Sequence, residues 1–119
     1  MILNEGLNRI RDLIDTDIDV GQLGTGTTLE TPTQTGLVSS ISDSSGSGSS
    51  VSTTKTSRQF VKQYTANSGI GNTNTVTEFA FRRSTSPITD FNRVTFVGVT
   101  KNNTIDIRIK TRFFINSLI

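Results

Sequence analysis

The side chains of this chain that could do chemistry are carboxylates, because it contains no cysteine and no histidine. That absence excludes imidazole bases, thiolate nucleophiles, disulfides and almost every transition-metal site. Glu78, Asp90 and Asp106 could supply the carboxylate pair of a glycoside hydrolase. Acids near the turns of strand-rich chains are usually solvated, so we expect these three on the surface. The sequence therefore predicts no catalytic residue, no cofactor and no enzyme activity.

A second acidic group is the D-x-D-x-D run of Asp15, Asp17 and Asp19. Clustered carboxylate oxygens favour hard cations, but the EF-hand loop also needs glycine at position 6 and glutamate at position 12, and both are missing here. We expect the three acids on the solvated face of a short strand. The sequence predicts no metal site.

Charge is divided along the chain. Residues 1–50 carry two basic and seven acidic side chains, a net of −5, and residues 51–119 carry ten basic and three acidic, a net of +7. This division suits nucleic-acid binding, or subunits that dock the acidic part of one copy on the basic part of the next. The basic residues are scattered over several strands without stacking aromatics. We expect subunit docking and no nucleic-acid partner.

Apolar residues alternate through the last third of the chain, at the period that places successive side chains on opposite faces of a strand. Strands are expected at 59–65, 76–81, 91–99 and 104–115, with short polar turns between them. Arg108, Lys110 and Arg112 share the polar face of the last strand. That face is interpreted as a solvated outer surface or as an electrostatic contact with a neighbouring protein. The predicted fold is mainly β, a jelly-roll-like antiparallel β-sandwich with a short N-terminal α-helix.

The predicted helix runs from residue 5 to residue 13 or 15, with Asn4 as its N-cap. Its apolar stripe is formed by Leu3, Leu7, Ile10 and Ile14. A helix this short is marginal alone in water, so the stripe must lie on a sheet or on another subunit. We predict these four residues, with Arg108, Lys110 and Arg112, as subunit contacts.

The chain is expected to form a single domain, 1–119, in four segments. They are the helix (1–16), a strand followed by a Gly/Thr loop (17–38), a Ser/Gly-rich loop or arm (39–57) and the β-sheet core (58–119). Glycines at 21, 24 and 26 are expected to end the first strand in a turn. The Ser/Gly tract is either an exposed loop or, at 51–56, an edge strand that orders against another subunit.

The hydrophobic fraction of 32% is low for a globular domain, so we expect an interior completed by neighbouring copies. No leader is predicted, because the N-terminus has no positive region followed by an apolar core. No membrane span is predicted, because no window approaches about 18 consecutive apolar residues.

Four features of this chain occur together in a defined order. The helix NEGLNRIRDL (4–13) is followed by QLGTGTT (22–28), then by a variable Ser/Thr tract, and then by VTEF (76–79), RVTF (93–96) and VTK (99–101) before the terminal strand. This order resembles the phage tail-fibre, tail-collar and related virion proteins of tailed phages and archaeal viruses. The segment 39–56 departs from that pattern.

The resemblance implies a non-enzymatic virion structural protein that forms a homo-oligomeric tail, neck or capsid-surface appendage. Its expected partners are copies of itself, as a trimer or higher oligomer, and other virion proteins of the tail, portal, neck or capsid. Neither nucleic acid nor membrane is expected, and the implied location is the virion, assembled in the host cytoplasm. The alternative is a receptor- or glycan-binding module of a virus particle, with a host receptor as partner. Against it, the chain offers no tryptophan and only Tyr64 as a tyrosine platform.

Overall fold

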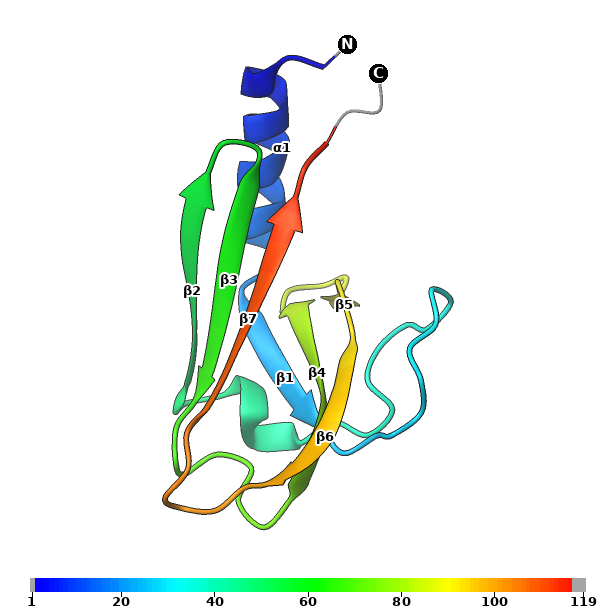
Figure 1. The fold of residues 1–119 in the computed structure, drawn as a ribbon, viewed down its shortest axis with the longest axis vertical. Coiled ribbons are helices and arrows are strands. Elements are labelled where there is room, and N and C mark those ends of the chain that lie inside the picture. Colours follow the sequence, from blue (N-terminus) through cyan, green and yellow to red (C-terminus); the bar gives the residue numbers. More distant parts are fainter. Residues whose placement is uncertain (1, 117–119) are drawn as a thin grey trace.

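The computed structural model describes residues 2–116, which form two β-sheets and a long N-terminal helix (Figure 1). In chain order the elements are α1 (Asn4–Asp17), β1 (Val20–Gly24), the 3-10 helix η1 (Ser42–Ser45), β2 (Ser49–Thr56), β3 (Gln59–Ala66), β4 (Thr75–Arg83), β5 (Thr89–Asp90), β6 (Val94–Thr100) and β7 (Ile107–Phe114).

Both sheets are antiparallel. Sheet A has β4 at its centre, paired with β1 on one side and with β5 and β6 on the other. Sheet B has the order β2-β3-β7. The predicted fold class, a mainly β sandwich with an N-terminal helix, is confirmed.

Five aromatic rings join the two sheets at the core. Tyr64 of β3 packs on Phe79 of β4 with ring centroids 4.8 Å apart, and Phe81 meets Phe113 of β7 at 6.1 Å. Phe60 stacks on Phe113 within sheet B at 4.9 Å. Because aromatic pairs prefer offset-stacked, tilted or edge-on arrangements, this cluster favours one relative orientation of the two sheets as well as burying apolar surface. Phe79 and Phe81 of β4 are both fully buried, and their rings meet edge-on with centroids 4.8 Å apart.

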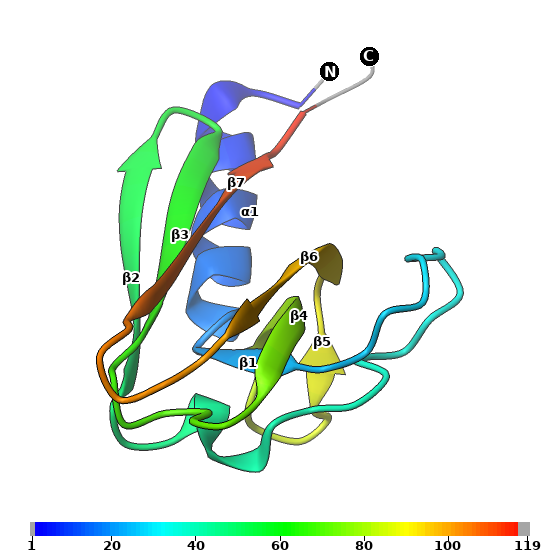
Figure 2. The same cartoon turned by 60° about the horizontal axis from the view of Figure 1, so that its bottom comes forward.

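The molecule is elongated, with extents of 50 × 27 × 27 Å. Its radius of gyration of 15.1 Å exceeds the ~13.5 Å expected for a compact chain of this length. Figures 1 and 2 show the reason: sheet A covers only the lower part of sheet B, and α1 lies against the upper part. The helix therefore replaces a second sheet over half of sheet B.

The helix is longer than predicted and begins differently. It starts at Asn4 and ends at Asp17, so Asn4 is its first residue and not its cap; Leu3 holds the cap position without a side-chain hydrogen bond. The expected strand at 17–20 was also wrong, because Ile18 is the C-cap of α1. Ile18 is buried in the core, which explains its apolar character without a strand.

The glycines after Val20 were predicted as a turn, but two of them lie inside β1. At Gly21 a Cβ atom would collide with the Tyr64 ring and would come within 2.8 Å of Phe79. Glycine therefore lets β1 pass directly over the aromatic cluster, a close approach that the sequence pattern alone presents as a break.

The Ser/Gly-rich tract is also more ordered than an exposed loop. Residues 42–45 form η1, and 49–56 form β2, which pairs along its whole length with β3 of the same chain. Ser44 is fully buried, and its hydroxyl donates to the Ile41 carbonyl at 2.6 Å and accepts from Leu23 N–H at 2.9 Å. The edge-strand interpretation of 51–56 was right about the strand. Its partner is intramolecular, so the boundary at residue 57 divides a hairpin of the core sheet.

Candidate functional site

The three basic residues of the last strand lie on the outer face of sheet B, and we call them the basic row: Arg108, Lys110 and Arg112. All three are exposed, and none forms an ion pair within residues 2–116. Register places them beside Thr65, Gln63 and Val61 of β3. The Arg112 guanidinium also lies 5.9 Å from the centroid of the Phe114 ring. Their predicted common face is confirmed.

Sheet B has two open edges. Within the described residues, β2 and β7 each pair with β3 alone, and each is eight residues long. The outward side chains of β2 are small and uncharged, because Ser50, Ser52 and Thr54 alternate there. The basic row borders the opposite edge. Open edges of this length are ready to pair with another chain.

The β6 edge of sheet A is less suited to pairing with a strand of another chain. Between the pairs Val76–Val99 and Glu78–Thr95, one residue of β4 faces three residues of β6. This bulge leaves Val97 91% exposed. Because a bulge interrupts the ladder and twists the strand, β6 is blunted against edge-to-edge pairing, unlike β2 and β7.

The apolar stripe of α1 is divided between the core and the solvent. Leu7 is buried and Ile14 packs against the core cluster, so both contact their own chain. Leu7 is therefore not available as a subunit contact, which corrects that part of the prediction. Leu3 and Ile10 remain exposed, together with Leu13. The stripe lies on a sheet, one of the two outcomes expected for a short helix.

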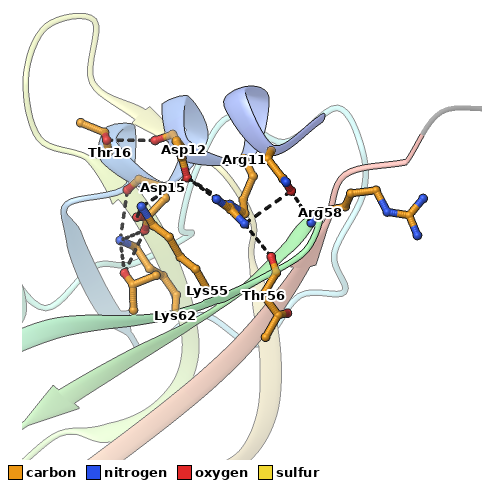
Figure 3. Close-up of polar contacts among 10 residues, drawn as sticks. Arg11, Asp12, Asp15, Thr16, Lys55, Thr56, Arg58 and Lys62 are labelled. Atoms are coloured by element: carbon orange, nitrogen blue, oxygen red, sulfur yellow. Dashed lines mark hydrogen bonds and ion pairs between the residues drawn. The ribbon is translucent and has the colours of Figure 1, made fainter. Parts of the chain in front are cut away.

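The charge division is compensated in part inside the chain, because Asp12, Asp15 and Asp17 of the acidic half pair with basic residues of the other half. Docking between copies stays a prediction. Figure 3 shows acidic residues of α1 facing basic residues of β2 and β3. Lys62 Nζ lies 2.6 Å from Asp15 Oδ1. Lys55 Nζ lies 3.3 Å from Asp12 Oδ1 and 3.4 Å from Asp15 Oδ2. Arg11 of the helix donates to the Thr56 carbonyl at 2.7 Å. These contacts attach α1 to the hairpin of sheet B.

The acids of the D-x-D-x-D run separate. Asp15 turns to Lys62, Asp17 accepts from Arg83 at 2.7 Å, and Asp19 accepts the backbone N–H of Ser84 at 2.8 Å. The predicted solvated strand face was wrong, since the first two acids belong to a helix and all three have protein partners. In the described residues no group of three acids is placed to hold a metal ion.

Glu78 is fully buried, which corrects the expectation that it lies on the surface. Its carboxylate accepts hydrogen bonds from the backbone N–H groups of Gly26 (2.7 Å), Val38 (3.0 Å) and Ser39 (2.9 Å). It also accepts from Arg93 Nε at 2.8 Å. One carboxylate therefore holds both ends of the 26–38 loop against β4 and β6.

The charge of Glu78 is maintained by these donors. Burial raises the pKa of its carboxyl, but the hydrogen bonds from Arg93 and from three backbone amides outweigh it and hold the pKa below its usual value. Asp90 also forms an ion pair, because Arg82 Nε lies 2.6 Å from Asp90 Oδ1. Asp106 alone of the three candidate acids is exposed, as expected.

Arg93 was not singled out from the sequence, although it is the only side-chain cation bonded to Glu78 in the described residues. Its side chain is 5% exposed. The signal available was weak: Arg93 is a lone arginine directly before β6 (Val94–Thr100). The sequence left β2 open as one of two alternatives, an edge strand or an exposed loop, because a Ser/Thr-rich segment also has the composition of a loop.

No family model, curated protein or solved structure matches this chain. Neither helix of residues 2–116 has the length and apolar character needed to cross a bilayer.

Proposed function

We propose that the chain is a non-enzymatic virion structural protein that assembles with copies of itself into a tail, neck or capsid-surface appendage. The virion assignment follows the resemblance of the opening helix, the GTGTT segment and the terminal strands to that group of proteins. The observation that carries self-assembly is the pair of open eight-residue edges on one sheet, β2 and β7.

The direction of the two edges favours a head-to-tail contact. Since β2 and β7 are each antiparallel to β3, they run parallel to each other. When β7 of one copy lies along β2 of the next, sheet B continues with the same strand direction in every copy. A heterologous contact of this kind closes into a ring or extends as a filament.

Charge opposes the competing two-fold contact. An antiparallel β7–β7 pair centred on Lys110 would place that residue opposite its own copy, and Arg108 opposite Arg112. Directly opposed like charges destabilise a strand pair. The outward residues of β2 carry no charge, so the basic row meets no repulsion there. The two edges of sheet B are thus better suited to each other than β7 is to itself.

The candidate acids have structural partners. Glu78 holds two loop ends and an arginine, and Asp90 is paired with Arg82. A carboxylate that acts as a general acid needs a raised pKa, whereas that of Glu78 is lowered. We therefore propose no catalytic role for either residue.

Charge placed on β2 tests the assembly. The double variant Ser52→Lys/Thr54→Lys puts positive charge beside the basic row of the next copy, and we expect sedimentation to show association weakened at least about tenfold. Ser52→Glu/Thr54→Glu should strengthen association at low salt. Thr104→Lys, in the exposed turn before β7, is the control. A wild-type chain that stays monomeric at high concentration and fails to join virion components would contradict the proposal, as would equal effects of the Lys and Glu variants.

A further inference from the structure

The outer face of sheet B presents positive charge with no negative charge on its strands. β2, β3 and β7 contain no aspartate or glutamate. Their two lysines outside the basic row, Lys55 and Lys62, are paired with acids of α1. The three cations of the basic row have only uncharged neighbours on β3, and the nearest acid in the sequence is Asp106, directly before β7. This face therefore attracts an anionic polymer.

Arg58 adds a fourth cation to the basic row. It is exposed in the turn between β2 and β3 and forms no ion pair among residues 2–116. Its carbonyl accepts from Ile115 N–H at 2.7 Å, which places it beside the end of β7 that carries Phe114. Figure 3 shows its side chain extending away from the polar contacts of α1. From this turn the cations follow one another along β7, in the order Arg58, Arg112, Lys110 and Arg108.

Each cation of the basic row shares a rung of sheet B with neutral side chains. Successive rungs are two residues apart along the strands, or about 7 Å. Hydroxyl and amide side chains, together with arginine and lysine, are the groups that contact the phosphates and sugars of a nucleic-acid backbone. The three rungs are Ser50, Thr65 and Arg108, then Ser52, Gln63 and Lys110, then Thr54, Val61 and Arg112.

Phe114 supplies an aromatic ring at one end of these cations. It is 61% exposed, and its ring centroid lies 5.9 Å from the guanidinium carbon of Arg112. Proteins that bind single strands stack bases on such rings beside a basic track, and every base can make this contact. In the sequence the basic residues are scattered without stacking aromatics, which argued against nucleic acid. At this face the fold removes both reasons, because it gathers four cations and places a ring beside them.

The shape of the face favours a single strand. The major groove of duplex DNA admits a helix or a two-stranded ribbon, whereas sheet B is three strands wide. A bilayer would need apolar side chains, and Val61 and Phe114 are the only ones in the outward positions of these strands. We propose that the outer face of sheet B binds single-stranded nucleic acid, with the four cations along its phosphates and Phe114 stacked on a base. Strand pairing between copies uses the edges of sheet B, so this binding does not depend on the proposed assembly.

The test is the fluorescence anisotropy of a labelled thymidine oligonucleotide of about 12 nucleotides, titrated with the full-length chain. We expect a Kd between about 1 and 100 µM near physiological salt. Four phosphate contacts predict that the logarithm of the association constant falls with the logarithm of salt concentration with a slope of about −2.8. Lys110→Gln should reduce that slope to about −2.1. Arg9→Gln, which removes an exposed cation from α1, is the matched control and should leave the slope unchanged.

Two further variants separate the parts of the proposal. The wild type should bind the thymidine strand at least about fivefold more tightly than an abasic strand of equal length, and Phe114→Ala should remove this difference. Ser52→Lys/Thr54→Lys adds cations to the same face, so it should strengthen oligonucleotide binding while it weakens association between copies. Because this variant gains binding, its result cannot come from misfolding, and it distinguishes failure of this inference from failure of the proposed assembly.

Four outcomes would overturn the inference. The first is the absence of saturable oligonucleotide binding up to about 300 µM protein, beyond the usual range of non-specific binding. The second is tighter binding of a duplex of equal length or of phosphatidylglycerol vesicles. The third is tighter binding of an oligoglutamate peptide of equal charge, which would assign the face to an acidic protein. The fourth is an equal loss of affinity in Lys110→Gln and Arg9→Gln.

Discussion

Asp15 and Lys62 form a nearly buried ion pair that attaches α1 to the inner face of sheet B. The carboxylate and ammonium groups lie 2.6 Å apart, and their side chains are 11% and 7% exposed. Thr53 of β2 donates to the same carboxylate oxygen at 2.8 Å. A helix, a central strand and an edge strand therefore meet at one acid, over the half of sheet B that sheet A does not cover.

Loss of that acid should destabilise the fold. We expect Asp15→Asn to lower the free energy of unfolding by about 3 kcal/mol, because it leaves the ammonium group of Lys62 buried without a counter-charge. Urea denaturation measures the change. Asp106→Asn is the control, since Asp106 is exposed, and it should change stability by less than about 0.5 kcal/mol. Equal losses in the two variants would refute the role given to the pair.

Stability should fall with acidification. Burial raises the pKa of Asp15, but hydrogen bonds from Lys62 and Thr53 outweigh it and lower the pKa below 3.8; that of Glu78 is likewise held below 4.5. Both groups stay ionised in the folded chain at a pH where the unfolded chain takes up protons, so their stabilisation is complete at neutral pH. This stabilisation is lost as the pH falls, first through the pKa values of the two groups in the unfolded chain and then through their lower pKa values in the folded chain. Urea midpoints between neutral pH and pH ~3 should show this decline, and Asp15→Asn should make it shallower. A decline of unchanged slope in the variant would contradict the assignment.

Glu78 should be coupled to Arg93. Glu78→Gln leaves a buried guanidinium without its counter-charge, and we expect a loss of about 3–5 kcal/mol. In a double-mutant cycle with Arg93→Met, the double variant should lose less than the sum of the single losses, by about 1–3 kcal/mol. Chemical denaturation of the four proteins measures this coupling. Additive losses would show that the two side chains act separately.

Gly21 should not tolerate a side chain. Its missing Cβ makes room for the rings of Tyr64 and Phe79, so Gly21→Ala should cost about 1–3 kcal/mol through overpacking. Gly69→Ala is a matched control, because no atom lies within 4 Å of its added Cβ. That variant should be neutral or slightly stabilising in thermal unfolding. A tolerated Gly21→Ala would mean that β1 does not run against the aromatic cluster.

The period of two in 104–115 predicted β7 and the shared face of Arg108, Lys110 and Arg112, and the structure has both. The apolar spacing of Leu3, Leu7, Ile10 and Ile14 similarly predicted α1. Such patterns succeed because they report a property of one element: which face of a strand or helix avoids water. The absence of cysteine and histidine likewise excluded whole classes of chemistry, because folding cannot supply a side chain that the chain lacks.

Tertiary structure alone decided what the polar residues do. Glu78 is bonded to amides 39 to 52 residues away along the chain, and no local pattern marks a carboxylate that will be buried by distant loops. Asp15, Asp17 and Asp19 form one cluster in the sequence. In the structure α1 ends between them, and they contact three different residues, Lys62, Arg83 and Ser84. The Ser/Thr-rich β2 is a strand because β3 supplies its hydrogen bonds. Local spacing determines which face is apolar, whereas the partners of polar groups depend on contacts that form only when distant segments meet.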